Sequence, residues 1–177
     1  MPSGQILIAA VMGHPIAHSR SPLMHNFWLK EYGLNGSFVA LDVKPDDLEK
    51  ELRGLPSKSF RGTCVTIPHK ERTLTFMDDL DPSARAIGAV NLVTVLSDGR
   101  LRGHNTDGYG FIENIRGQGT WERTKNHAIV LGAGGAARAI VYALAVEGFS
   151  AVTVINRTRV KADQLIKDIQ PGVETSL

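Results

Sequence analysis

Short apolar runs alternate with amphipathic stretches along this chain, and glycine or proline stands at most of the boundaries. Residues 5–11 are almost entirely apolar, which indicates a strand buried on both faces. Residues 37–43 and 61–67 predict a second and a third strand. Between the strands, apolar positions at helical spacing predict helices from Ser21 to Gly33 and from Pro45 to Gly54. The first part of the chain therefore alternates strands with helices.

The middle of the chain continues this alternation and then changes. A helical pattern runs from His69 to about Leu80, and a short helix begins at residues 81–83. Residues 89–96 and 101–104 flank Ser97-Asp98-Gly99, a turn sequence that predicts a β-hairpin. A helix that carries Phe111, Ile112 and Ile115 follows the hairpin.

A new strand–helix–strand unit begins after the polar stretch 117–126, which predicts a linker. Residues 128–131 and 151–155 predict strands, and a helix is expected from about Val160 to Ile169. The whole order predicts an α/β protein with mainly parallel sheets. A doubly wound nucleotide-binding domain needs two halves, each of three strands and two helices, but fewer than fifty residues follow Ala128. We therefore expect an N-terminal, mainly parallel α/β substrate domain followed by an incomplete Rossmann-like nucleotide-binding unit.

Composition narrows the class of protein. The chain has 177 residues, is 42% hydrophobic and carries a net charge of +2, with its basic residues dispersed. Dispersed charge argues against a nucleic-acid partner. The single cysteine, Cys64, excludes an internal disulfide and fits a reducing cytoplasm. The run Ile6–Met12 is too short to span a membrane and lacks signal-peptide flanks. We expect a cytoplasmic protein without a membrane or metal partner.

The turn between the predicted strand 128–131 and its helix is rich in glycine. Gly132 would allow the tight turn, Gly134 a close backbone approach to a pyrophosphate, and Ala137 close packing of helix on strand. In this setting Gly-x-Gly-x-x-Ala predicts dinucleotide binding at the helix N-terminus. Glycine-rich turns without a nucleotide are also common. The predicted cofactor contacts of this turn are Gly132, Ala133, Gly134, Gly135 and Ala136.

Two polar clusters lie where helices begin in the first half of the chain. Ser21 before Pro22 is typical of a helix N-cap. Together with Ser19, it also offers two hydroxyls to a small carboxylate. Lys70 follows the third predicted strand and is, in the simplest interpretation, a solvated surface lysine. If it is partly buried, its pKa can fall and it becomes a proton donor or acceptor.

Two further polar residues stand in apolar surroundings. Asn91 lies inside an apolar strand, where a buried amide needs a partner in the fold or in a ligand. Asp107 precedes a helix, where an aspartate is more often a cap than a catalytic group. Paired with Lys70, however, it would hold an acid–base group in its working protonation state.

The motifs taken together resemble the shikimate dehydrogenase family, in order and in approximate spacing. They are Gly13-His14-Pro15, Ser19-Arg20-Ser21-Pro22, His25-Asn26, Val65-Thr66-Ile67-Pro68-His69-Lys70, Ile87-Gly88-Ala89-Val90-Asn91, Asn105-Thr106-Asp107-Gly108, Gly132–Ala137 and Asn156-Arg157-Thr158. The resemblance implies NADPH-dependent reduction of 3-dehydroshikimate to shikimate, in aromatic amino acid biosynthesis. It also implies a substrate domain at 1–116, a linker at 117–126 and a partial NADP domain at 127–177.

The resemblance further implies roles for single residues. Ser19 and Ser21 would bind the substrate carboxylate. Lys70 would be the catalytic acid–base residue, paired with the catalytic Asp107. The ring hydroxyls would be contacted by Thr66, Asn91 and Asp107.

The residues after the strand 151–155 favour NADP over NAD. NAD enzymes usually place an acidic side chain there for the ribose 2′-hydroxyl. This chain has no acidic residue at that point. Its cationic side chains and a hydroxyl suit the 2′-phosphate of NADP instead. The predicted contacts are Asn156, Arg157, Thr158 and Lys161.

Two departures from the family pattern leave alternatives open. Cys64 stands where the family typically has Asn, and a thiol replaces an amide poorly as a hydrogen-bonding group. A quinate/shikimate dehydrogenase is therefore an alternative. Family members are also about a hundred residues longer, so a non-catalytic shikimate-binding chain is a second alternative. The unfinished sheet would expose strand edges and apolar faces. We expect the second unit to be covered by a partner chain, for instance through domain exchange in a homodimer, or to be poorly ordered.

Overall fold

The chain forms two compact units in the computed structural model, which describes residues 6–118 and 127–169. The first unit holds the residues up to Asp81 and Val90–His104, and the second holds Pro82–Ala89 and the residues from Asn105 onward. The chain therefore crosses between the units three times. Contacts place 82–89 and 105–116 in the second unit, whereas the sequence assigns them to a substrate domain. The division into a substrate domain and a cofactor domain stays a prediction. Most of the predicted linker 117–126 lies outside the described residues.

A six-stranded mixed sheet forms the first unit within the described residues, in the order β2-β1-β3-β5-β6-β4. Its strands are β1 (Leu7–Gly13), β2 (Gly36–Asp42), β3 (Phe60–Val65), β4 (Asp79–Leu80), β5 (Leu92–Val95) and β6 (Leu101–His104). The strand β1 runs parallel to β2 and β3, and β5 pairs antiparallel with β3 and β6. The predicted hairpin is therefore confirmed. Ala10, Val11 and Met12 of β1 are at most 3% exposed, as expected for a central strand.

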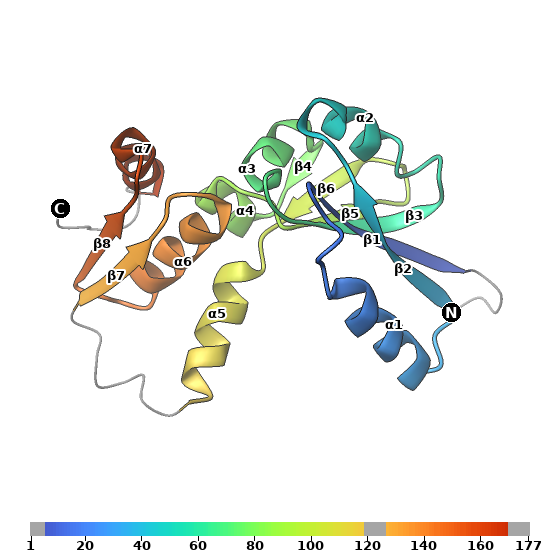
Figure 1. Ribbon diagram of the computed structural model, residues 1–177, viewed down its shortest axis with the longest axis horizontal. Coiled ribbons are helices and arrows are strands. Elements are labelled where there is room, and N and C mark those ends of the chain that lie inside the picture. Colours follow the sequence, from blue (N-terminus) through green and yellow to red (C-terminus); the bar gives the residue numbers. More distant parts are fainter. Residues whose placement is uncertain (1–5, 119–126, 170–177) are drawn as a thin grey trace. The chain divides into compact units, whose positions relative to one another are not determined.

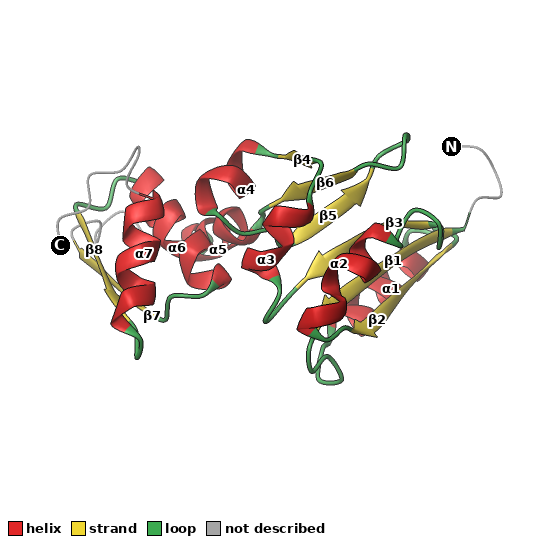
Figure 2. Cartoon of the chain, turned by 90° about the horizontal axis from the view of Figure 1, so that it is seen from above, coloured by secondary structure: helices red, strands yellow, loops and turns green. Residues whose placement is uncertain are grey.

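Helices cover both faces of this sheet. They are α1 (Ser21–Glu31), the 3₁₀ turn η1 (Pro45–Asp47), α2 (Leu48–Arg53), α3 (Lys70–Thr73) and the 3₁₀ turn η2 (Leu74–Phe76). Helix α1 lies on one face, and α2 and α3 lie on the other (Figures 1 and 2).

The helix predicted from His69 to Leu80 is wrong in its second half. Helical structure ends at Phe76, and β4 follows at Asp79–Leu80. Asp78 explains the difference, because its backbone N–H donates to the Leu101 carbonyl at 2.9 Å and its carboxylate accepts the Leu101 N–H at 2.8 Å. Pairing with the distant strand β6 therefore overrides the local helical pattern.

The second unit packs helices against a two-stranded parallel sheet within the described residues. Its elements are α4 (Pro82–Ile87), α5 (Asp107–Arg116), β7 (His127–Leu131), α6 (Gly135–Val146), β8 (Ala151–Ile155) and α7 (Arg159–Ile169). The predicted strand–turn–helix–strand–helix order is confirmed. Its core includes Val130, Ala137, Val141 and Leu165. No helix in the described parts of the chain is both long and apolar enough to cross a membrane.

Candidate active site

The carboxyl ends of β1 and β3 bring the first group of predicted residues together. The two strands are parallel neighbours, so their ends lie at one edge of the sheet. The Thr66 backbone N–H donates to the Met12 carbonyl at 2.9 Å. Gly13 makes this close packing feasible, because a Cβ there would lie 2.6 Å from Cγ2 of Thr66. The predicted substrate residue Thr66 is thus held against the end of β1.

Lys70 and Asn91 are fixed near the same strand end by backbone hydrogen bonds. The Lys70 carbonyl accepts the Val90 N–H at 2.8 Å, and the Asn91 carbonyl accepts the Val65 N–H at 2.8 Å. Lys70 is the first residue of α3 and is half-buried, as is Asn91. A half-buried lysine can exchange a proton with a bound polar ligand.

Ser19 and Ser21 lie at the start of α1. The Ser21 N–H donates to Ser19 Oγ at 3.3 Å, and the Ser19 N–H donates to the Ile16 carbonyl at 2.9 Å. The N-cap predicted at Ser21 is wrong: Arg20 is the N-cap, without a side-chain cap, and Ser21 is the first helical residue. The reason is that Ser19, two residues earlier, already supplies the hydroxyl for an N–H at the helix start. The pair still offers two hydroxyls that suit a carboxylate.

His69 precedes Lys70 and anchors the backbone there; the sequence assigned it no role of its own. It is 1% exposed, and its Nε2 donates to the Val43 carbonyl at 2.7 Å. Burial lowers the pKa of this imidazole, so it is neutral at physiological pH. The contact joins the start of α3 to the end of β2. No sequence signal distinguishes such a histidine from an exposed one.

The glycine loop of the second unit has the geometry that its sequence predicts. Gly132 has φ +109°, a conformation that favours glycine, and its N–H donates to the Ile155 carbonyl at 2.8 Å. Gly134 is the N-cap of α6, and Ala137 is buried in the core. Ala133 and Ala136 complete a loop without long side chains. The loop leaves the N–H groups at the start of α6 accessible to an anion.

The residues after β8 lie beside this loop, because β7 and β8 are parallel and the Gly132–Ile155 hydrogen bond joins their ends. Asn156 Nδ2 donates to the Thr158 carbonyl at 2.8 Å, which closes a turn before α7. Arg157, Thr158 and Lys161 are exposed. The structure thus brings the predicted cofactor residues together at one edge.

Asp107 belongs to the second unit and opens α5. Its N–H donates to Asn105 Oδ1 at 3.0 Å. Thr106, and not Asp107, is the N-cap of this helix. Lys70 belongs to the first unit. The acid–base pairing of Lys70 with Asp107 therefore stays a prediction.

Comparison with known proteins identifies the family. Residues 11–93 match the model of the shikimate dehydrogenase substrate binding domain, and residues 117–176 match that of shikimate / quinate 5-dehydrogenase. The chain belongs to the shikimate dehydrogenase family. The predicted resemblance is therefore confirmed over most of the chain.

Individual relatives agree with the family models. Shikimate dehydrogenase (NADP(+)) of Paramagnetospirillum magneticum is 49% identical over 168 residues, which are 94% of this chain and 61% of the relative. The enzyme of Methylobacterium radiotolerans is 51% identical over 96% of this chain and 61% of its own length. The crystal structure of Thermus thermophilus shikimate 5-dehydrogenase with NADP(H) and shikimate has a TM-score of 0.83 at 42% identity, covering 97% of this chain and 63% of that one. The chain thus spans about 61% of these two curated relatives.

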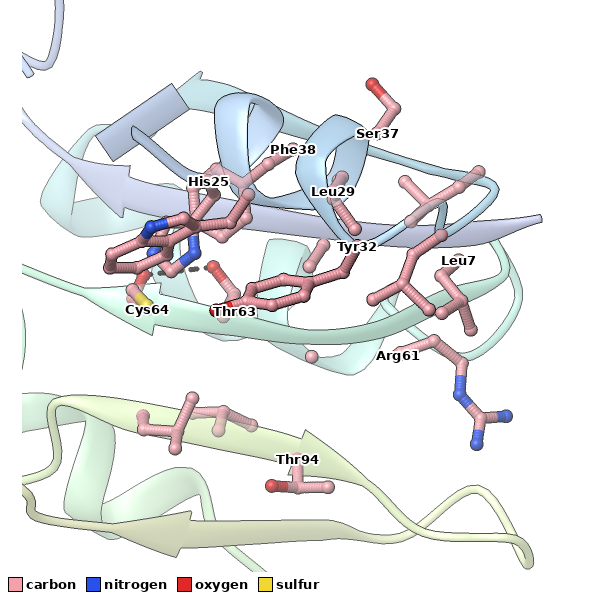
Figure 3. A pocket seen from close by; sticks show the side chains of 17 residues that line it. Leu7, His25, Leu29, Tyr32, Ser37, Phe38, Arg61, Thr63, Cys64 and Thr94 are labelled. Carbon is pink, nitrogen blue, oxygen red and sulfur yellow. Dashed lines mark hydrogen bonds between the residues drawn. The ribbon is translucent and has the colours of Figure 1, made fainter. Parts of the chain in front are cut away.

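Cys64, which the sequence predicts to depart from the family pattern, lines an apolar cavity of about 530 Å³ between α1 and the sheet (Figure 3). Trp28, Leu29, Tyr32 and Phe38 are among its lining residues, whereas none of the predicted substrate residues lines it. This lining does not suit a ring acid with a carboxylate and hydroxyls. The thiol is therefore surrounded mainly by apolar groups in this family member.

Proposed function

We propose that this chain carries the substrate-binding residues and the first part of the cofactor site of an NADP-dependent shikimate dehydrogenase. The observation that carries the proposal is the gathering of Thr66, Lys70 and Asn91 at one sheet edge by backbone hydrogen bonds. A hydroxyl, an ammonium and an amide are the groups that a polyhydroxylated ring acid requires. Ser19 and Ser21 would bind its carboxylate. Asp107 would contact a ring hydroxyl.

The loop of the second unit fits a dinucleotide phosphate. Its residues from Gly132 to Ala137 carry no side chain beyond Cβ, so a pyrophosphate can approach the backbone. The positive charges of Arg157 and Lys161, with no acid among residues 156–161, suit the 2′-phosphate of NADP. When bound, NADPH supplies a hydride to the substrate carbonyl carbon. Lys70 donates the proton that the carbonyl oxygen needs and stabilises its negative charge.

The direct test mixes the chain with shikimate and NADP⁺ and follows NADPH by its absorbance. Turnover supports the enzyme, and no turnover with shikimate binding by calorimetry supports the second candidate, a shikimate-binding chain without catalysis. The same assay with quinate in place of shikimate tests a third candidate, a quinate/shikimate dehydrogenase. The sequence leaves this candidate open because Cys64 stands where an asparagine is expected.

We propose in addition that a second copy of the chain covers the β7–β8 sheet. Ile129, Leu131 and Ile155 of these strands are 63%, 78% and 53% exposed, which supports an apolar contact. Light scattering after gel filtration should give the mass of a dimer; a monomeric mass at all concentrations contradicts the proposal. The single cysteine supports a cytoplasmic location for the protein.

A further inference from the structure

Asn105 is a buried polar residue to which the proposed function assigns no role. It is 5% exposed and lies between two segments of the second unit. Its Nδ2 donates to the Ala89 carbonyl at 2.9 Å, and its Oδ1 accepts the Asp107 N–H at 3.0 Å. Its own carbonyl accepts the Ser83 hydroxyl at 3.1 Å. Because both ends of the amide meet backbone groups, the side chain is held in one orientation.

The contact with Oδ1 sets where α5 begins. An asparagine oxygen that accepts the N–H two residues later closes a local turn, and Asp107 is the first residue of α5. One residue further on, a Cβ at Gly108 would lie 2.9 Å from the Ala139 carbonyl of α6. Asp107 is therefore held between a side-chain hydrogen bond and a close helix–helix contact.

Helix α6 is in turn tied to the segment that Asn105 contacts. Arg138 is 6% exposed; its Nε donates to the Ile87 carbonyl at 2.8 Å and its guanidinium pairs with Asp168 at 2.7 Å. Ile87 is two residues before Ala89. The helix that begins at the glycine loop and the helix that begins at Asp107 thus share one hydrogen-bonded frame within the second unit.

We propose that Asn105 is a positioning residue, which orients the Asp107 carboxylate toward the hydroxyls of the substrate ring. The inference rests on the proposed function, which gives Asp107 that contact. Asn105 itself does not touch the substrate; it acts through the backbone of Asp107.

Two substitutions separate positioning from stability. Asn105→Ala and Asn105→Ser both remove the donation to the Ala89 carbonyl, so both should lower Tm by a similar amount. Only serine keeps an oxygen that can accept the N–H two residues later. In calorimetric titration of the full chain with shikimate, Asn105→Ala should weaken binding about ten-fold and Asn105→Ser less than about three-fold. The control Ser83→Ala, which removes the bond to the Asn105 carbonyl, should stay within about two-fold of wild type.

A double-mutant cycle gives the decisive result. In an Asp107→Ala background, Asn105→Ala should change the Kd for shikimate by less than about two-fold, because Asn105 acts through Asp107. Equal weakening in both backgrounds, or equal weakening by alanine and serine, overturns the inference. If Asn105→Ala does not fold, a folded Asn105→Ser variant that binds ten-fold more weakly overturns it as well. A wild-type chain that binds no shikimate overturns the proposed function instead.

Discussion

Lys70 shows how single residues obtain a defined place in this protein. Its carbonyl is bonded to the Val90 N–H, and the preceding His69 is bonded to the Val43 carbonyl. Val43, just after β2, and Val90 thus hold the backbone from which the ammonium group extends. A proton donor must first lie within hydrogen-bonding distance of the atom that it protonates, and only then does its pKa matter. A fixed backbone at Lys70 serves the first of these requirements.

Removal of this ammonium group tests the role of Lys70. Lys70→Ala should lower shikimate turnover by about 10²–10⁴-fold, the usual contribution of a general acid, and should change the calorimetric Kd for shikimate much less. The matched control is Lys50→Ala, an exposed lysine of α2, which should retain wild-type turnover. Unchanged turnover in Lys70→Ala would remove Lys70 from the proposed mechanism.

The exposed Arg157 after β8 is the residue proposed to select NADP over NAD. Arg157→Ala should weaken NADP⁺ binding by about ten- to a hundred-fold, because a charge-assisted hydrogen bond to phosphate is lost, and should affect NAD⁺ by less than about three-fold. Fluorescence titration with both nucleotides measures the difference. Lys167→Ala, at the other end of α7, is the control. Equal weakening of both nucleotides contradicts a 2′-phosphate contact.

At the scale of elements, small residues determine how closely the helices of the second unit approach. Gly108 on α5 faces the Ala139 carbonyl of α6, whereas a Cβ at Gly110 on the same helix would meet nothing within 4 Å. The two glycines share a helix and differ in what surrounds them. This makes them a matched pair for measuring the contact.

Adding one methyl group at each position separates packing from helix propensity. Gly108→Ala should lower the free energy of unfolding by about 1–3 kcal/mol, because the backbone carbonyl of Ala139 cannot easily move away. Gly110→Ala should raise it by about 0.5–1 kcal/mol, since alanine favours the helix. Urea denaturation measures both values. An equal gain in stability for the two variants would show that α5 and α6 are not in close contact at Gly108.

At the scale of the whole molecule, burial and hydrogen bonding shift the pKa of groups in both units. His25 and His69 lie in the first unit, and burial lowers the pKa of each below the ordinary 6.5. In the second unit burial opposes ionisation of Asp168, but hydrogen bonds from Arg138 and Gln164 outweigh it and lower its pKa below 3.8. The histidines are therefore neutral in the folded state, and the carboxylate is charged.

As the pH falls, the first unit should lose stability at a higher pH than the pH at which the contribution of Asp168 is lost. Below about pH 6.5 the unfolded chain binds protons that the folded histidines do not, so the free energy of unfolding falls as the pH decreases. The contribution of Asp168 is lost only as the pH falls below the usual carboxylate pKa. Thermal unfolding at pH 7.5 and 5.5 measures the effect. His69→Phe should reduce the change in Tm between the two pH values; an unreduced change contradicts the role of His69.

Local patterns predicted much of this fold. The apolar strand His127–Leu131, the glycine turn and helix α6 follow one another within twenty residues, so each depends on its immediate neighbours. The hairpin around Asp98 is similarly local. The candidate residues Ser19, Thr66, Lys70 and Asn91 were found because strand ends and helix starts are where α/β proteins place ligand groups.

Other features depended on contacts between distant parts of the chain. The strand β4 exists because Asp78 pairs with Leu101 across more than twenty residues, and no local pattern contains that partner. Likewise, the side chains of His69 and Asn105 are held by hydrogen bonds to the carbonyl groups of Val43 and Ala89, respectively. A burial pattern cannot reveal which carbonyl group will face a given side chain.

The sequence by itself determined the family and the order of most elements, and it supplied the candidate residues for the chemistry, because local patterns and motifs lie in adjacent positions. Only the tertiary structure decided that the chain crosses between its units three times and that α5 belongs with α6. It also decided which buried polar residues hold those segments. Such choices rest on packing and hydrogen bonds between residues far apart in sequence, whose energies exist only once the chain has folded.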